Sequence, residues 1–306
     1  MPLDPRARRL LDALSLGQAR PAGVAARRQA FRSLMRLADT GVQIAATEDR
    51  VLPGSLPIRL YTPPPQAVPG RLPGLVFLHG GGFVCGDLDT HDALCRTLCA
   101  DTGCRVIAVD YRLAPEHPYP AAVQDAHAAT LWVIEHAAAL GLDPARIAIA
   151  GESAGATLAA VVCQRVAKTH PGALALQLLL CPILDWAAGP ASRWDAAESS
   201  LLNSEMIAQD LACYLPVGQD ASDPQVSPLR APSLGDQPPT HIHTAECDPL
   251  RDEGTAYADK LQLAGVEVRH TCHDGMVHLF YGLGRAIPAA RAALGQIGAE
   301  IGAALA

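Results

Sequence analysis

A serine stands between two glycines directly after an apolar run. The run Arg146 to Ala150 leads into residues 151–155, which read Gly-Glu-Ser-Ala-Gly, and an alanine-rich helical stretch follows. Strand, tight turn and helix in this order are the context of a G-x-S-x-G nucleophile elbow. Glycines two residues before and after the serine let neighbouring backbone approach closely. The pattern therefore predicts Ser153 as a nucleophile, although the five residues alone would also suit an ordinary glycine-rich turn.

A second glycine-rich segment lies upstream of the serine by one strand–helix–strand passage. Residues 79–82 read His-Gly-Gly-Gly and follow the apolar run Leu75 to Leu78. Backbone N–H groups at this place can bind the oxygen that becomes negative during acyl transfer. We predict the donors as Gly80, Gly81 and Ala154. The supporting residues of the two motifs are His79, Gly82 and Glu152. The spacings of nucleotide-binding glycine loops are absent, which argues against a phosphate site.

A serine in such an elbow needs an acid and then a histidine downstream, in that chain order. The candidate acids after the predicted strand 240–245 are Asp248, Glu246 and, less well placed, Asp252. Asp248 lies in the loop before the next helix and is preferred. The downstream histidines are His270, His273 and His278. His278 is the predicted base and His273 the alternative, because His270 lies within a strand. Histidine suits this task because its pKa lies near neutral pH.

Strand-like and helix-like segments must place these residues at one edge of a sheet. Short β-branched runs alternate with longer helical segments from about residue 56 onward, which predicts a mostly parallel sheet flanked by helices. The predicted strands are 56–61, 74–78, 105–110, 146–150, 174–181, 240–245 and 266–271. The predicted helices are 90–101, 121–139, 154–168, 252–264 and 285–304. The predicted fold class is α/β.

Two regions depart from this alternation. Residues 1–45 carry apolar positions at helical spacing, with arginines on the other faces, and predict two amphipathic helices before the sheet. Residues 187–235 form a proline-flanked insertion between two strands, with a helical segment at 201–215. Insertions at the carboxyl ends of parallel strands cover the crevice where ligands bind. Both regions are candidates for a cap, and extra packing helices are the equal alternative.

Composition and charge limit the partners. The 306 residues are 49% hydrophobic with a formal net charge of -7, so we expect one large domain and no binding to nucleic acid. Residues 1–16 lack the apolar core of a secretory signal, which indicates a cytoplasmic location. Runs of about 18 apolar residues, which a membrane helix requires, are absent from the sequence. Stable membrane insertion is therefore not expected.

Cysteine and histidine clusters are interpreted as packing. The nine cysteines lack a C-x-x-C pair or zinc-type spacing, so free thiols are expected. His91, Cys95 and Cys99 share one helix face without an evident fourth ligand, and we assign them to the core. His241 and His243 project from one face of a strand and are also expected to be packed. We predict neither a metal site nor a cofactor.

Together these motifs resemble the bacterial hormone-sensitive-lipase-like (family IV) esterases of the α/β-hydrolase fold, over nearly the whole chain. The resemblance rests on residues 79–87, the run Tyr111 to Ala122, the serine elbow, residues 248–253 and His278. It implies a cap formed by residues 1–45 and the insertion at about 187–235, on a catalytic domain of 46–306. The prolines of the run 111–122 exclude a helix, and we interpret it as scaffold for the oxyanion loop.

The resemblance also implies an activity. It indicates a serine carboxylesterase that hydrolyses short-chain acyl esters, with a small-molecule ester as partner and a homodimer as one candidate assembly. Hydrolysis of an amide, lactone or carbonate needs the same residues. A non-catalytic small-molecule receptor on the same fold is the alternative of another class, and the presence of His278 argues against it. Two residues depart from the family. Its similar members usually carry Asp or Thr at the position of Glu152 and Gly at the position of Ala156.

Overall fold

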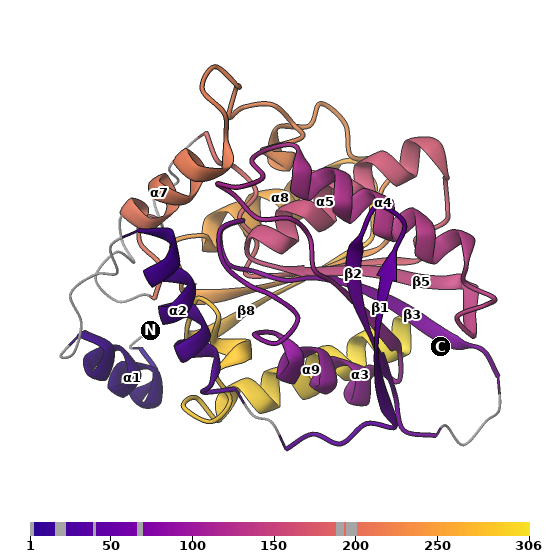
Figure 1. Cartoon of the computed structure of the whole chain (residues 1–306), viewed down its shortest axis with the longest axis horizontal. Helices are drawn as coiled ribbons and strands as arrows, with labels where there is room; N and C mark the ends of the chain where they lie inside the picture. The colour runs from indigo at the N-terminus through magenta and orange to yellow at the C-terminus, as the bar shows by residue number, and fades with distance from the viewer. Residues whose placement is uncertain (1–2, 16–22, 39–40, 66–69, 188–192, 194–200) are drawn as a thin grey trace.

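The computed structural model describes residues 3–15, 23–38, 41–65, 70–187, 193 and 201–306, and within these ranges eight strands form one sheet (Figure 1). The strand order is β1-β2-β4-β3-β5-β6-β7-β8. β1 pairs antiparallel with β2 and β2 with β4, whereas the neighbours from β4 to β8 pair in parallel. The strands are β1 (Ala46–Leu52), β2 (Leu56–Thr62), β3 (Leu72–Leu78), β4 (Arg105–Val109), β5 (Leu142–Glu152), β6 (Leu176–Leu180), β7 (Thr240–Cys247) and β8 (Val268–Val277). The prediction of a mostly parallel sheet is confirmed.

Helices cover both faces of this sheet. α4 (Ala121–Glu135), α5 (Ala154–Thr169) and α8 (Arg251–Leu263) lie on one face, and α3 (Asp92–Thr102) and α9 (Ala289–Ala304) on the other (Figure 1). Successive strand residues face opposite sides. In β3, Val76 and Leu78 therefore join the core under α4 and α5, whereas Leu75 and Phe77 join the core under α3 and α9. Burial on both faces explains the continuous apolar runs of the inner strands.

β1 is the one described strand that the sequence analysis did not predict. Six of its seven residues are exposed, and the segment reads Ala-Thr-Glu-Asp-Arg-Val-Leu. An edge strand with both faces in solvent lacks the apolar alternation on which the prediction depends. The seven predicted strands are all present, with bounds shifted by a few residues.

Two helices outside the sheet layers lie beside each other near the carboxyl ends of the parallel strands. They are α2 (Val24–Met35) and α7 (Ser204–Tyr214), and an ion pair between Arg27 of α2 and Asp210 of α7 joins them (Figure 1). The side chain of Asn203 caps α7 by accepting a hydrogen bond from Met206 N at 2.9 Å. α1 (Pro5–Ser15) precedes α2, so the two predicted N-terminal helices are present. Residues 188–192 and 194–200 of the predicted insertion lie outside the described residues.

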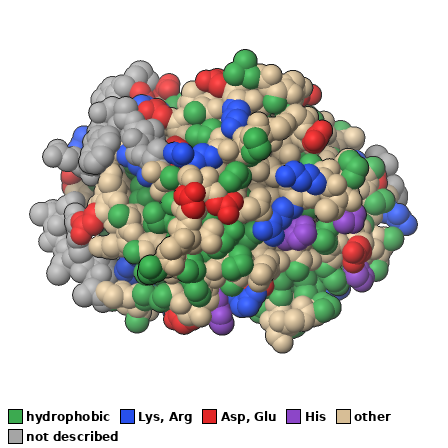
Figure 2. All heavy atoms as spheres, turned by 90° about the horizontal axis from the view of Figure 1, so that it is seen from above, with side chains coloured by type: hydrophobic (Ala, Val, Ile, Leu, Met, Phe, Trp, Pro, Cys, Tyr) green, Lys and Arg blue, Asp and Glu red, His purple; other side chains and the backbone are tan. Residues whose placement is uncertain are grey.

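The cysteines agree with the prediction of free thiols, and the surface carries charges of both signs, as far as the structure describes them. On the face seen in Figure 2, basic and acidic side chains are interspersed among apolar ones. Among the described residues, every helix is too short or too polar to cross a lipid bilayer. All nine cysteines are free thiols, and six of them are buried.

Candidate active site

Ser153 occupies the sharp turn between β5 and α5. Its backbone has φ 54° and ψ -118°, a conformation that residues other than glycine rarely adopt. The glycines around it are required by contact, because a Cβ atom on Gly151 would overlap the Gly155 carbonyl and one on Gly155 would overlap the Leu78 carbonyl. The Ser153 N–H donates to the Leu180 carbonyl at 2.9 Å, which ties the turn to β6.

Ser153, His278 and Asp248 form one chain of hydrogen bonds, although they come from distant parts of the sequence. The Ser153 Oγ atom lies 3.0 Å from His278 Nε2, and His278 Nδ1 lies 2.7 Å from Asp248 Oδ2. All three residues are at most 6% exposed. The Leu250 N–H donates to Asp248 Oδ1 at 2.9 Å and fixes the carboxylate. This geometry can transfer a proton from the hydroxyl to the imidazole.

The surroundings of His278 set its basicity. Burial by itself lowers the pKa of His278, but the charge of Asp248, its hydrogen bond and the charge of Glu152 outweigh burial. The pKa of His278 is therefore raised above the ordinary value for histidine. An imidazole stabilised in its charged form is suited to accept a proton.

The alternative acids from the sequence point elsewhere. Glu246 Oε2 accepts a hydrogen bond from the Gly275 N–H at 2.7 Å. Asp252 Oδ1 accepts one from Arg251 Nε at 2.9 Å. Of the three acidic candidates, Asp248 is the one whose carboxylate contacts His278.

The alternative histidines also have other neighbours. His273 Nε2 lies 3.3 Å from His243 Nδ1, and His270 Nε2 lies 3.1 Å from Thr244 Oγ1. Both residues belong to β8, whereas His278 follows the end of that strand. Leu279, with φ 63°, turns the chain directly after His278.

The glycine loop, residues 79–82, follows β3 and lies beside the elbow. Gly81 and Gly82 have φ values of 119° and 65°, and no hydrogen bond among the described residues uses the N–H groups of Gly81, Gly82 or Ala154. The Gly80 N–H instead points to His91 Nε2 at 3.3 Å. Of the three predicted donors, Gly81 and Ala154 are thus free to bind a ligand, and Gly80 is directed away. Gly82, predicted as a supporting residue, offers a free N–H as well.

Comparison with known proteins places this arrangement in a family. Residues 75–282 match the family described as alpha/beta hydrolase fold. The chain belongs to this family. It is 39% identical to esterase LipI of Mycobacterium tuberculosis over 94% of this chain and 91% of that protein. It is also 39% identical to the ethyl acetate hydrolase of Pseudomonas putida, over 76% of this chain and 74% of that protein.

A solved structure gives the same result for the whole fold. The hyperthermophilic esterase from the archaeon Pyrobaculum calidifontis superposes with a TM-score of 0.92 at 38% identity, and the match covers 100% of both chains. The resemblance to hormone-sensitive-lipase-like esterases is therefore confirmed for this α/β-hydrolase.

Behind the glycine loop of this α/β-hydrolase lies a buried polar network. Glu152 is fully buried, and its Oε2 lies 3.1 Å from His91 Nε2. His79 stacks on Tyr111 at 4.1 Å between ring centroids, and the Tyr111 hydroxyl donates to the His79 carbonyl at 2.6 Å. Burial and the neighbouring His91 lower the pKa of His79 to about 3, so His79 is neutral. His91, assigned to the core from the sequence, is buried and also holds the loop.

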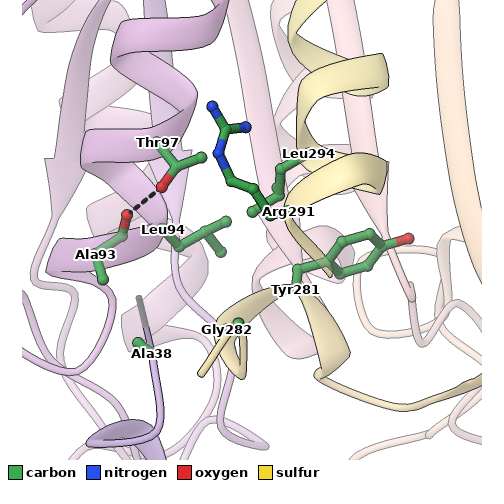
Figure 3. A pocket seen from close by; sticks show the side chains of 9 residues that line it. Ala38, Ala93, Leu94, Thr97, Tyr281, Gly282, Arg291 and Leu294 are labelled. Atoms are coloured by element: carbon green, nitrogen blue, oxygen red, sulfur yellow. Dashed lines mark hydrogen bonds between the residues drawn. The ribbon is translucent and has the colours of Figure 1, made fainter. Parts of the chain in front are cut away.

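Two hollows of this α/β-hydrolase lie away from Ser153. The first, between α3, α9 and the short helix η2 (Phe280–Gly282), has a volume of about 10 Å³, and Figure 3 shows Leu94, Tyr281 and Leu294 around it. That volume holds about one water molecule. The second, about 290 Å³, is lined by Gln164, Lys168 and segments of residues 223–237. Neither hollow contains a residue of the Ser153–His278–Asp248 chain.

Proposed function

We propose that this protein is a serine carboxylesterase that hydrolyses short-chain acyl esters through an acyl-enzyme. The observation that carries the proposal is the chain of hydrogen bonds from Ser153 Oγ through His278 to Asp248. In the first step, Ser153 Oγ attacks the ester carbonyl while His278 Nε2 takes its proton. His278 then gives this proton to the departing alcohol. Water repeats the two steps on the acyl group and frees the acid.

The N–H groups of Gly81, Gly82 and Ala154 are proposed to bind the oxyanion. Their freedom from other hydrogen bonds supports this role, and the contact of Gly80 with His91 assigns Gly80 to positioning the loop instead. Donors already aimed at the developing charge stabilise the transition state more than the ester. Each donor is worth on the order of a hundredfold in rate.

α2 and α7 are proposed to act as a cap. Asp210 of α7 lies against Gly82, where the lack of a side chain leaves room for its carboxylate. The ring of Phe83 stacks on Tyr214 of α7 with centroids 3.8 Å apart. A cap that touches the glycine loop limits the space for an acyl chain. The similarity to an ethyl acetate hydrolase supports the same preference for small esters.

Hydrolysis of p-nitrophenyl esters from acetate to palmitate tests this function. We expect the highest kcat/KM on the shortest chains and loss of turnover in Ser153→Ala, while Ser222→Ala, an alteration away from the site, keeps full activity. A reactive phosphonate should label Ser153 covalently, as mass spectrometry of the labelled peptide would show. Turnover that survives Ser153→Ala contradicts the mechanism. A preference for palmitate contradicts the short-chain assignment alone.

A homodimer is a further part of the proposal. β8 ends the strand order, and its residues from Val268 to Asp274 are all exposed or half-buried, which offers a second copy an edge to pair with. Light scattering coupled to size-exclusion chromatography measures the mass, and a mass of one chain would contradict pairing. The cytoplasmic location stays a prediction that cell fractionation can test.

A further inference from the structure

Three side chains that the proposed reaction does not use converge between β7 and α9. His241 and His243 project from the same face of β7, and Glu300 comes from the C-terminal part of α9. Glu300 Oε2 lies 3.6 Å from His243 Nε2 and 3.9 Å from His241 Nδ1. His243 is fully buried and His241 is 7% exposed. Two imidazole nitrogens and one carboxylate oxygen thus lie within 4.8 Å of one another.

These three atoms have no hydrogen-bond partner among the described residues, although each is buried. The distances between them are too long for hydrogen bonds. A buried polar atom without a partner costs about 1–3 kcal/mol, so three of them close together require an explanation. A bound cation would satisfy all three at once.

The neighbours leave each of these atoms free to coordinate. Glu300 Oε1 accepts a hydrogen bond from Gln296 Nε2 at 2.9 Å and lies 3.6 Å from Arg269, so Oε2 is the free oxygen. His243 Nδ1 lies 3.3 Å from His273 Nε2 and can donate to it, which leaves His243 Nε2 without a proton. A hydrogen bond on the far nitrogen is the usual way in which a ligating histidine is oriented.

We propose that His241 Nδ1, His243 Nε2 and Glu300 Oε2 bind a divalent transition-metal ion of the Zn²⁺ class. Ligands at about 2.0–2.2 Å from a tetrahedral zinc lie roughly 3.4 Å apart, close to the two spacings to Glu300. Water would complete the coordination. The ion would join α9 to the strand that leads to Asp248, and its role is structural because Ser153 belongs to a different cluster. This assignment revises the interpretation of His241 and His243 as packing alone.

Isothermal titration of Zn²⁺ into untagged, chelator-treated protein tests the site. We expect one ion per chain in the wild type, and affinity weaker by on the order of a hundredfold or more in Glu300→Gln and in His241→Gln. His270→Gln is the matched control, since His270 lies on neighbouring β8 but contributes no atom to the cluster, and it should bind as the wild type does. Zn²⁺ should also raise the Tm of the wild type and leave that of Glu300→Gln unchanged. Esterase activity of the variants checks that they are folded.

A second cluster must be distinguished, because Cys181, Asp248 and His278 also present donor atoms within 4.8 Å of one another. Co²⁺ bound there would show thiolate charge-transfer absorption and would inhibit the esterase. Co²⁺ at the proposed site would show d–d bands alone, with activity retained and binding unaffected by Cys181→Ser. Absence of binding to the wild type, binding that survives both Glu300→Gln and His241→Gln, or binding lost in Cys181→Ser would overturn the proposal.

Discussion

Asp248 acts on His278 in two ways, by holding Nδ1 at 2.7 Å and by favouring the charged ring against burial. Both effects require the carboxylate in this position. The loop after β7 provides it, because the Leu250 N–H fixes the other oxygen of Asp248. The side chains of Glu246 and Asp252, a few residues away, are turned to other partners.

Asp248→Asn should therefore lower kcat by about 10,000-fold with little change of structure, because the amide favours the wrong imidazole tautomer. Steady-state kinetics on p-nitrophenyl acetate measures this. Glu246→Gln and Asp252→Asn are matched controls that should stay near the wild-type rate. An equal loss in either control would move the acid to that residue.

The pH dependence of the rate should report the same environment. His278 takes the serine proton only when its ring is neutral, so kcat/KM rises as the pH increases through the pKa of His278. Since Asp248 and Glu152 outweigh burial and raise this pKa, the midpoint should lie above about 6.5, the ordinary value for histidine. Glu152→Gln should move it downward. A wild-type midpoint below the ordinary value would show that burial dominates.

Sequence motifs predicted individual residues well where chemistry fixes their local context. Ser153, Asp248 and His278 were each chosen from position along the chain, and the structure brings them together. The glycine run by itself does not show whether Gly80 or Gly82 offers its N–H to the oxyanion. It depends on His91, which takes the Gly80 N–H, and on Asp210, which lies against Gly82. Such contacts between distant segments have no signature in the glycine run.

At the scale of elements, an ion pair between Arg27 and Asp210 joins α2 to α7. Burial raises the pKa of Asp210 to about 7, and the attraction of Arg27 limits the rise. The exposed fractions of the two side chains are 14% for Arg27 and 6% for Asp210. A pKa above the unfolded value of about 4 means that this carboxyl supports folding at low pH, and that its contribution is lost as pH rises through about 7.

Arg27→Gln should make this dependence steeper. At about pH 9 the buried Asp210 carboxylate would have no counter-charge, and we expect a loss of about 3–5 kcal/mol in the free energy of unfolding. At about pH 6 the loss should be smaller, because Asp210 can remain protonated. Urea unfolding at both pH values measures the difference. Arg32→Gln, on the same helix but with a half-exposed side chain, should cost less than about 1 kcal/mol. Equal losses at the two pH values would refute the assignment.

Strands and helices were predictable where their burial requires a regular pattern of apolar residues in the sequence. The inner strands β3, β5 and β6 are buried on both faces and were found from their apolar runs. β8 continues to Val277, six residues beyond its predicted end at 271. The prediction ended too early because exposed and half-buried polar residues such as Arg269 and His273 break the apolar pattern. β1 was not predicted for the same reason, since its exposed residues lack an apolar pattern.

At the scale of the whole molecule, the cysteine thiols differ in how deeply they are buried. Cys272 is the exposed cysteine, whereas Cys85 and Cys104 lie in the core. Burial raises the pKa of Cys85 and of Cys104 to about 11. Reaction with an alkylating reagent requires both access and a thiolate.

Native alkylation should therefore modify Cys272 first. The six buried thiols should react only when urea unfolds the chain, and all at the same urea concentration if the two cores unfold together. Peptide mass spectrometry after a short pulse of iodoacetamide measures each site. Early labelling of Cys163, on the buried face of α5, would show that this part of the core opens independently.

The strained backbone at Ser153 sets the activity of the protein against its stability. A side chain held at φ 54° costs about 1–3 kcal/mol, and glycine is free of this cost. Ser153→Gly should thus be more stable in urea than Ser153→Ala, which keeps the strained geometry. A descendant of this gene released from selection for hydrolysis could gain stability by this one substitution. Retention of the serine through mutational drift would then be a record of continuous selection for activity.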